Sequence, residues 1–487
     1  MTNCNPSLFT ILTTYLNFLA LLIFGHVRDF WRTYFVADSS SVVTPKGYAP
    51  LLKSFDDFYQ RRMYTRIKDC WERPICSRPA AWIDIMERVS TDFNKTFTFT
   101  KKTIHALNLG SYNYLGFALN PDHVTKEIFN SLDQYGIGTC SPAGEFGYTA
   151  VHRDLEKEVA QFVGKEDSVV FSMGYATNST TFPCLAGKGS LIISDRLNHT
   201  SIVRGARATG AKIEVFKHNN MKHLEHVIRQ AIVKGQPKTR RPWKKIIIVV
   251  EGIYSMEGEM VDLKTCVELK KKYKCYLYVD EAHSIGAIGK SGKGICEHTG
   301  VDPADVDILM GTFTKSFGSV GGYVASSKAV INHIRRTSFS PLYGSSMPVA
   351  CACQALNALR VITGEDGTNI GKERLQALAR NSEYFLNGLR KLGFEVIADV
   401  GSPVIVVMLY NPGKMPGFSR ECLKRGVAVV VVGAPATDIL EGRVRFCLSA
   451  NHTIEDLELA LEKLSEVGDL TNTKYMKQKM LQGQDTH

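Results

Sequence analysis

Two hydrophobic, strand-like runs in the middle of the chain end in polar residues that could do chemistry. Asp280 ends the run CYLYVD, with His283 three residues later, and Lys315 follows the run ILMGT in a turn of small and hydroxyl-bearing residues. A carboxylate at the end of a buried strand needs a cation, and a partly desolvated lysine suits covalent chemistry with a carbonyl group. Taken singly, Asp280 could equally be a helix N-cap and Lys315 a solvated surface residue.

The segment FSMGYATN adds a third signal, because it predicts a strand end followed by Gly174, Tyr175 and a helix start. Glycine lets backbone amides approach an anion, and the N-terminus of a helix favours negative charge. Alone this turn is weak evidence. Together the three segments supply a phosphate cradle, a carboxylate for a pyridinium nitrogen and a reactive amine. Pyridoxal 5'-phosphate (PLP) requires these groups, so the sequence predicts a PLP site.

The segments that must position these residues alternate between short apolar runs and helix-length patterns. Six runs are almost continuously hydrophobic, which is typical of buried strands in a mainly parallel sheet: 168–172, 191–194, 212–216, 246–251, 276–280 and 308–312. Helical patterns between them, such as 152–163 and 263–273, predict an α/β fold with helices flanking the sheet. Ligands of such folds bind at the carboxyl ends of the strands.

Beyond about residue 364 the pattern changes to a smaller α+β domain. We expect a helix at 372–392, strands at 403–409, 427–432 and 443–448, and a terminal helix capped by Thr453. Residues 43–99 are irregular and rich in aromatic side chains, so they are interpreted as an arm. The predicted division is a membrane segment at 1–31, an arm and linker at 32–105, a large domain at 106–362, a small domain at 363–470 and a tail at 471–487.

The N-terminus carries an uncharged apolar run at 8–24, slightly short of the ~20 residues that cross a bilayer comfortably. A signal peptide does not fit, because no Lys or Arg precedes the run and no small-residue cleavage site follows it. A helix lying in the membrane interface stays an alternative to the membrane anchor that we expect. Arg28, Arg32 and Lys46 follow the run, so the positive-inside rule leaves the rest of the chain in the cytosol.

Bulk composition sets limits without choosing a function. Of 487 residues, 44% are hydrophobic and 22% charged, which is typical of a globular protein. The 59 Lys and Arg against 48 Asp and Glu give a net charge of +11, which favours anionic partners. Part of that charge lies in the basic stretch 234–245, interpreted as a solvated loop. The 12 cysteines form no CxxC pair, so we expect free thiols and no metal site.

Several longer stretches resemble the α-oxoamine synthase family, whose members are PLP-dependent transferases of fold type I. They include SYNYLGFA, FSMGYATNS, ISDRLNHTSIV, FKHNNM, LYVDEAHSIGA, DILMGTFTKSFGSVGGY and RFCLSANHT, and they span about residues 107–470. The segments GQPKTRRPWKKIIIVVEGIYSMEGE and VVVVGAPAT, with the apolar N-terminus, make the chain most similar to the catalytic subunits in the family's eukaryotic serine palmitoyltransferase branch.

The resemblance implies a role for nine residues matched by position. Lys315 would bind the cofactor covalently and act as the base, Asp280 would pair with the pyridinium nitrogen, and His283 would contact the ring hydroxyl. His199 would stack on the ring and help to place the amino-acid carboxylate, which Arg445 would bind. The remaining cofactor contacts would come from Gly174, Tyr175, Ser255 and Thr312.

The resemblance also implies a reaction and a setting. The enzyme would condense L-serine with palmitoyl-CoA to 3-ketodihydrosphingosine, the first step of sphingolipid biosynthesis. It would form a heterodimer with a lysine-less sister subunit in the endoplasmic reticulum membrane, facing the cytosol, and could bind small regulatory membrane subunits. Two positions depart from the family pattern: Ala143 stands where an arginine is usual, and Asp438 stands where the Pro-Ala-Thr loop usually continues with proline.

Three alternatives compete with this interpretation. The string DEAH at 280–283 and the basic charge suggest a nucleic-acid helicase, but that class needs a phosphate loop before the string. The similar segment 289–291 follows the string, and Ser284 replaces the first glycine, so no nucleic-acid partner is expected. Lys315 argues against a non-catalytic scaffold subunit. Relatives that make 5-aminolevulinate, 2-amino-3-ketobutyrate or 8-amino-7-oxononanoate stay open.

Overall fold

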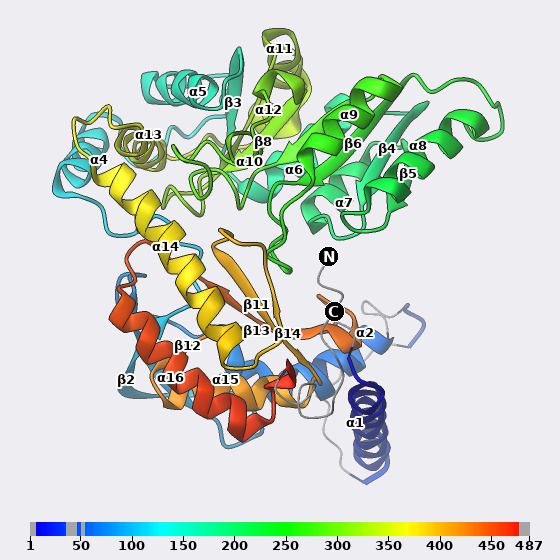
Figure 1. The fold of residues 1–487 in the computed structure, drawn as a ribbon, viewed down its shortest axis with the longest axis vertical. Coiled ribbons are helices and arrows are strands. Elements are labelled where there is room, and N and C mark those ends of the chain that lie inside the picture. The colour runs from blue at the N-terminus through cyan, green and yellow to red at the C-terminus, as the bar shows by residue number, and fades with distance from the viewer. Residues whose placement is uncertain (1–5, 36–45, 50–53, 477–487) are drawn as a thin grey trace.

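The computed structural model describes residues 6–35, 46–49 and 54–476. Its largest sheet has seven strands and lies in the upper part of the molecule in Figure 1. Its strands are β3 (Asp167–Phe171), β4 (Ser190–Asp195), β5 (Lys212–Phe216), β6 (Lys245–Glu251), β7 (Tyr276–Asp280), β8 (Ile308–Thr312) and β9 (Gly322–Ser326). Their order is β3-β9-β8-β7-β6-β4-β5. Strands β4 to β8 pair in parallel and only β9 runs antiparallel to its neighbours. The predicted mainly parallel sheet is therefore confirmed.

Side chains alternate between two hydrophobic layers along each strand. Ile192 and Ile247 face one layer, whereas Ile193 and Ile248 face the other. The first layer is closed by helices α6 (Gly174–Leu185), α7 (Thr200–Ala208) and α11 (Lys328–Thr337). The second is closed by α5 (Ala150–Phe162), α8 (Met221–Lys234), α9 (Leu263–Tyr273) and α13 (Val349–Thr363). Because both faces are covered, the strand sequences are continuously hydrophobic.

The C-terminal part forms the smaller α+β unit that the sequence predicts. Its antiparallel sheet has the order β10-β11-β14-β13, with strands β10 (Val396–Ile397), β11 (Val404–Tyr410), β13 (Val430–Val432) and β14 (Gly442–Cys447). Helices α14 (Ile370–Lys391) and α15 (Lys414–Lys424) pack against this sheet, and α16 (Ile454–Thr471) packs against both helices. Thr453 caps α16 by accepting a hydrogen bond from the Asp456 backbone, as predicted.

The segment 43–99, interpreted from its irregular pattern as an arm, contains regular structure at its C-terminal end. Strands β1 (Trp82–Val89) and β2 (Thr98–Asn108) form an antiparallel pair, and β12 (Val427–Ala428) joins β2 in parallel. The sequence did not predict this pair of strands, because exposed polar residues such as Lys101 and Lys102 interrupt the alternation of apolar and polar side chains that marks a half-buried strand. The domain boundaries stay a prediction, and most of the predicted tail, 477–487, lies outside the described residues.

The remaining helical elements are short, apart from α4, which packs against α13. They are α3 (Thr65–Ile67), α4 (Asp122–Tyr135), α10 (Ile295–Thr299), α12 (Phe339–Tyr343), a π-helical turn η1 (Gln60–Tyr64) and the 3-10 turns η2 (Lys68–Cys70), η3 (Pro303–Asp305) and η4 (Ile439–Glu441).

Helix α1 (Leu8–Phe35) projects at the edge of the molecule beside α2 (Ser54–Tyr59) (Figure 1). Within the described ranges, its stretch Leu8–Trp31 is the one helix long and apolar enough to cross a membrane. Near its C-terminal end the helix is attached to the arm: Asp29 accepts a 2.9 Å hydrogen bond from Arg61 and pairs with Arg62. Most large side chains of the apolar stretch are exposed, so α1 presents an uncovered apolar surface.

Candidate active site

Lys315 lies in the turn after β8, at the carboxyl edge of the large sheet. Its Nζ lies 5.7 Å from the centre of the Tyr112 ring. Burial lowers the pKa of Lys315 to about 8, although the negative charges of Asp280 and Glu251 act in the opposite direction. The neutral amine is the form that acts as a nucleophile or a base. It is therefore available in the physiological range, unlike the amine of a solvated lysine.

Asp280 ends β7 directly beside Glu251, its partner in β6. The side chain is almost fully buried, and its carboxylate accepts hydrogen bonds from Asn178 Nδ2 at 2.7 Å and from the Ala282 backbone at 2.9 Å. It makes no ion pair with any described residue, and no helix follows it before Ile295, so it is not a helix N-cap. A buried carboxylate without an ion pair suits a cationic nitrogen of a ligand.

His283 lies in the turn after Asp280 and is packed among aromatic side chains. Its Nδ1 is 2.7 Å from the Tyr114 hydroxyl, and its ring meets that of Tyr112 edge-on at 5.4 Å. Burial, with help from the Lys315 and Arg445 cations, holds the pKa of His283 well below its usual value. The imidazole is therefore neutral, and its Nε2 has no hydrogen-bond partner in the described part of the chain, which leaves that atom for a ligand.

His199 is the N-cap residue of α7, and it is exposed. Its Nδ1 lies 2.7 Å from Ser201 Oγ, and its backbone N–H donates to Glu251 Oε1. The ring of Tyr175 approaches edge-on at 6.0 Å. These contacts fix the orientation of the imidazole, and its exposure makes it accessible to a planar ligand.

Arg445 reaches the site from β14 of the small sheet. Its guanidinium lies 4.7 Å over the Tyr112 ring, and its Nη1 is 3.5 Å from the Ser255 carbonyl oxygen. The side chain is buried, and its Nε has no hydrogen-bond partner among the described residues. Leaving a buried donor unsatisfied costs about 1–3 kcal/mol, so an anionic ligand would stabilise this arrangement.

Gly174 and Thr312 form the opposite end of the cluster. Gly174 begins α6, and a Cβ atom there would come within 2.9 Å of Thr312 Oγ1. The Thr312 hydroxyl donates to the Gly321 carbonyl at 2.8 Å and also meets Thr314 Oγ1 at 2.8 Å, so it is already engaged within the turn. The N–H groups at the start of α6 are therefore the stronger candidates for an anion. A role for Thr312 stays a prediction.

The nine predicted residues thus form one connected cluster whose groups fit PLP. The buried carboxylate without an ion pair suits the ring nitrogen, the start of α6 suits the phosphate, and the lysine with the lowered pKa suits the aldehyde. The unsatisfied Nε of Arg445 suits a substrate carboxylate. Ser255 contacts Arg445 through its backbone carbonyl oxygen, and a role for its hydroxyl stays a prediction.

Three residues that contact the cluster were not predicted from the sequence: Asn178, Glu251 and Tyr112. Asn178 bridges Asp280, Ser201 and the Tyr278 hydroxyl, and it lies one helical turn after Gly174 in the segment FSMGYATN. Glu251 is a polar residue at a strand end, the same signal that identified Asp280. Tyr112 lies in the segment SYNYLGFA, but nothing in its spacing indicates that it reaches both Lys315 and Arg445.

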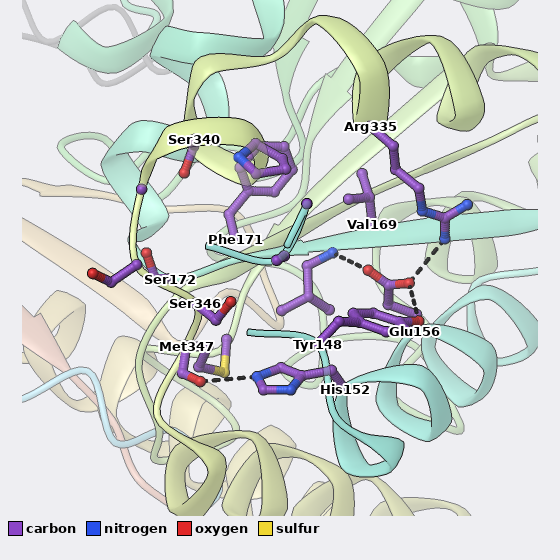
Figure 2. A pocket seen from close by; sticks show the side chains of 16 residues that line it. Tyr148, His152, Glu156, Val169, Phe171, Ser172, Arg335, Ser340, Ser346 and Met347 are labelled. Atoms are coloured by element: carbon purple, nitrogen blue, oxygen red, sulfur yellow. Dashed lines mark hydrogen bonds and ion pairs between the residues drawn. The ribbon is translucent and has the colours of Figure 1, made fainter. Parts of the chain in front are cut away.

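A second space, separate from the nine residues, is a cavity of about 350 Å³ lined on one side by β3 (Figure 2). Glu156 accepts hydrogen bonds there from Tyr148 at 2.9 Å, from the Val170 backbone at 2.9 Å and from Arg335 at 2.8 Å. Ala143, which departs from the family pattern, lines the same cavity. Among the described residues that line the cavity, Arg335 of α11 is the one arginine.

Comparison with known proteins agrees with this geometry. The family described as aminotransferase class I and II matches residues 104–464. Serine palmitoyltransferase 2 of Dictyostelium discoideum is 56% identical over 439 residues, covering 90% of each chain. Serine palmitoyltransferase 3 of Homo sapiens is 48% identical over 470 residues, covering 96% of this chain and 85% of the human one.

Solved structures give the same result. The serine palmitoyltransferase of Sphingomonas wittichii superposes with a TM-score of 0.75 at 28% identity, covering 87% of this chain and 99% of that one. A serine palmitoyltransferase structure with a PLP internal aldimine gives a TM-score of 0.74 at 28% identity, covering 87% and 100%. The chain therefore belongs to the serine palmitoyltransferase catalytic subunits, within the class I and II aminotransferase family of PLP-dependent enzymes.

Proposed function

We propose that this chain catalyses the condensation of L-serine with palmitoyl-CoA, releasing CoA and CO2 and forming 3-ketodihydrosphingosine. The observation that carries the proposal is the pair of side chains on the adjacent strand ends of β7 and β8. Asp280 is a buried carboxylate without an ion pair, and Lys315 is an amine with a pKa of about 8. A non-catalytic scaffold subunit would need neither group. The names of the relatives support serine and an acyl-CoA as the substrates.

When bound, PLP supplies an electron sink for negative charge on the α-carbon of serine. Asp280 keeps a proton on the ring nitrogen, because a carboxylate at hydrogen-bond distance favours the charged form of that nitrogen. Arg445 binds the carboxylate of serine, and His199 covers the ring. Lys315 Nζ removes the proton from the α-carbon, a step for which a positioned base typically contributes ~10²–10⁴-fold.

The later steps use the same groups. The α-carbon of serine forms a bond to the thioester carbonyl of palmitoyl-CoA, and the C–S bond breaks so that CoA leaves as the thiolate, which takes a proton from solvent. The bond between the α-carbon and the carboxyl group then breaks to release CO2, and Lys315 returns a proton to that carbon.

Substitution of Asp280 tests this assignment. Asp280→Asn keeps the shape and the hydrogen bond from Asn178 but loses the charge that holds the ring proton, so we expect turnover to fall at least ~10²-fold. Asp280→Glu keeps the charge and should retain more activity. Product formation from serine and palmitoyl-CoA is measured, with far-UV circular dichroism as the folding control. Equal activities of the two variants would contradict a charge-dependent role.

A partner subunit is the second part of the proposal. Large apolar side chains stand exposed in the two segments that line one part of the cavity, with Phe146 91% and Tyr343 74% exposed. The loop of Phe146 and helix α12 are joined by the hydrogen bond from the Gly144 backbone to the Pro341 carbonyl, so this surface is continuous. Such a patch favours a protein interface. We propose that the lysine-less sister subunit covers it; small regulatory membrane subunits stay a prediction.

Replacing Phe146 with Asp should reduce co-purification of the sister subunit, because a charge at the centre of an apolar interface is costly to bury. Val233→Asp, 83% exposed but on α8, is the matched control and should leave the complex intact. Full serine- and palmitoyl-CoA-dependent activity from this chain alone, as a homodimer, would contradict the heterodimer.

Membrane attachment through α1 is the third part. The apolar surface of Leu8–Trp31 supports an anchor in the endoplasmic reticulum membrane with the catalytic domain in the cytosol. Burial is worth ~25 cal/mol per Å2 of apolar area, which exceeds what the basic loop at 234–245 would gain at an anionic surface.

Deleting residues 1–24 should release the protein from membranes and keep the contacts of Asp29 with Arg61 and Arg62. The full-length protein should resist carbonate and high-salt washes of membrane pellets, whereas the truncated protein should be in the supernatant. If the basic loop alone attached the protein, high salt should release the full-length protein as well, since salt screens exposed charges within ~10 Å at 0.1 M. Full-length protein that washes off in salt would exclude an embedded anchor.

A further inference from the structure

His218 lies between two carboxylates at the carboxyl edge of the large sheet. Its Nδ1 is 2.9 Å from Asp195 Oδ1, and its Nε2 is 3.1 Å from Glu259 Oε2. The side chain is 13% exposed and that of Asp195 only 1%. An ionised carboxylate only accepts hydrogen bonds, so both ring nitrogens must carry a hydrogen. The geometry therefore requires His218 to be a cation.

The three residues come from three segments at the carboxyl edge of the large sheet: the end of β4, the loop after β5 and the turn after β6. Asp195 ends β4 and starts the loop that leads to His199; its carboxylate also accepts hydrogen bonds from the backbones of Leu197 and Asn219, both at 2.9 Å. His218 follows β5. Glu259 closes the turn after β6, which carries Ser255. The two loops that bear predicted site residues are thus joined through one imidazole.

We propose that His218 is a positioning residue, whose cation ties the loop Asp195–His199 to the turn Tyr254–Glu259 and so fixes His199 relative to Ser255. Without the cation, Asp195 and Glu259 would face each other across a mostly buried space, and their repulsion would separate the loops. The Tyr254 ring packs edge-on against the imidazole at 4.4 Å, so the turn is also held by contact. The activity readout of this proposal rests on the proposed function; its stability readout does not.

The charged groups around the imidazole give the proposal a pH signature. Asp195 faces it from β4, and Tyr254, Glu257 and Glu259 face it from the turn after β6. Burial lowers the pKa of His218, but the hydrogen bonds to Asp195 and Glu259 outweigh it and raise the pKa to about 10. The unfolded value is ~6.5. The stabilisation is therefore complete below pH ~6.5 and is lost as the pH rises through 10.

The test uses the PLP-loaded complex with its partner and the variants His218→Gln and His218→Gln/Glu259→Gln. We expect His218→Gln to lower kcat/KM for serine by ~10²-fold, the scale of a misplaced catalytic group, with an unchanged KM for palmitoyl-CoA. Removing Glu259 as well should recover part of the loss, because it removes the repulsion. The matched control is His105→Gln, since His105 pairs with Asp84 at 2.8 Å but is 64% exposed; it should behave as the wild type.

Thermal unfolding between pH 6 and pH 10 separates positioning from packing. The wild-type Tm should fall more steeply over this range than that of His218→Gln, and the double variant should have the higher Tm of the two variants at pH 7. If His218→Gln does not fold, a double variant that does fold shows the same recovery. Glu259→Gln alone should make the fall of Tm with pH less steep than in the wild type. The proposal would be overturned if the Tm of the wild type and that of His218→Gln changed in parallel with pH. It would also be overturned if the double variant were no more stable and no more active than His218→Gln, or if His218→Gln left kcat/KM for serine unchanged. A complex without serine condensation activity would contradict the proposed function while the Tm profiles still decide the role of His218.

Discussion

The buried carboxylate of Asp280 is the constraint on which the rest of this structure depends. Its charge is held by Asn178, which is itself held by the Tyr278 hydroxyl at 2.7 Å and donates to Ser201 at 3.0 Å. These bonds orient the carboxylate but supply no positive charge. The fold therefore presents an oriented anion at the edge of its central sheet, and a cationic ligand nitrogen completes the arrangement. Lys315, on the adjacent strand end, adds an amine whose lowered pKa follows from the same burial.

The two parts of the molecule contribute different chemistry to this centre. The parallel sheet brings strand ends that are distant in sequence to one edge, which is why Asp280, Lys315, Glu251 and the loop of His199 meet there. The small antiparallel sheet adds Arg445, and Tyr112 packs against both Lys315 and Arg445. The turn after β6 lies between the two parts: Arg443 of β14 pairs with its Glu257 at 2.9 Å, and His218 holds its Glu259 from the other side.

Much of this architecture is local enough to be predicted from sequence. The six expected strands coincide with β3 to β8 to within one residue at each end, and Thr453 caps the last long helix as expected. Strand β9 was not predicted because SVGGYVAS contains two glycines, which usually mark a turn, and the β1–β2 pair was not predicted because its exposed side chains break the alternation. The strand-end rule finds Asp280 and Lys315, whereas Asn178, Tyr112 and the pairing of His218 depend on contacts between segments far apart in the chain. The roles of His199, Ser255 and Arg445 come from family resemblance alone.

The most direct test of the central claim is to identify the residue that carries the cofactor. The purified PLP-loaded protein is reduced with borohydride, digested and analysed by peptide mass spectrometry. The account predicts that the peptide containing Lys315 gains the mass of a phosphopyridoxyl group and that a Lys315→Ala variant, still folded, gains none. A phosphopyridoxyl group on another lysine, or its absence from the reduced wild-type protein, would contradict it.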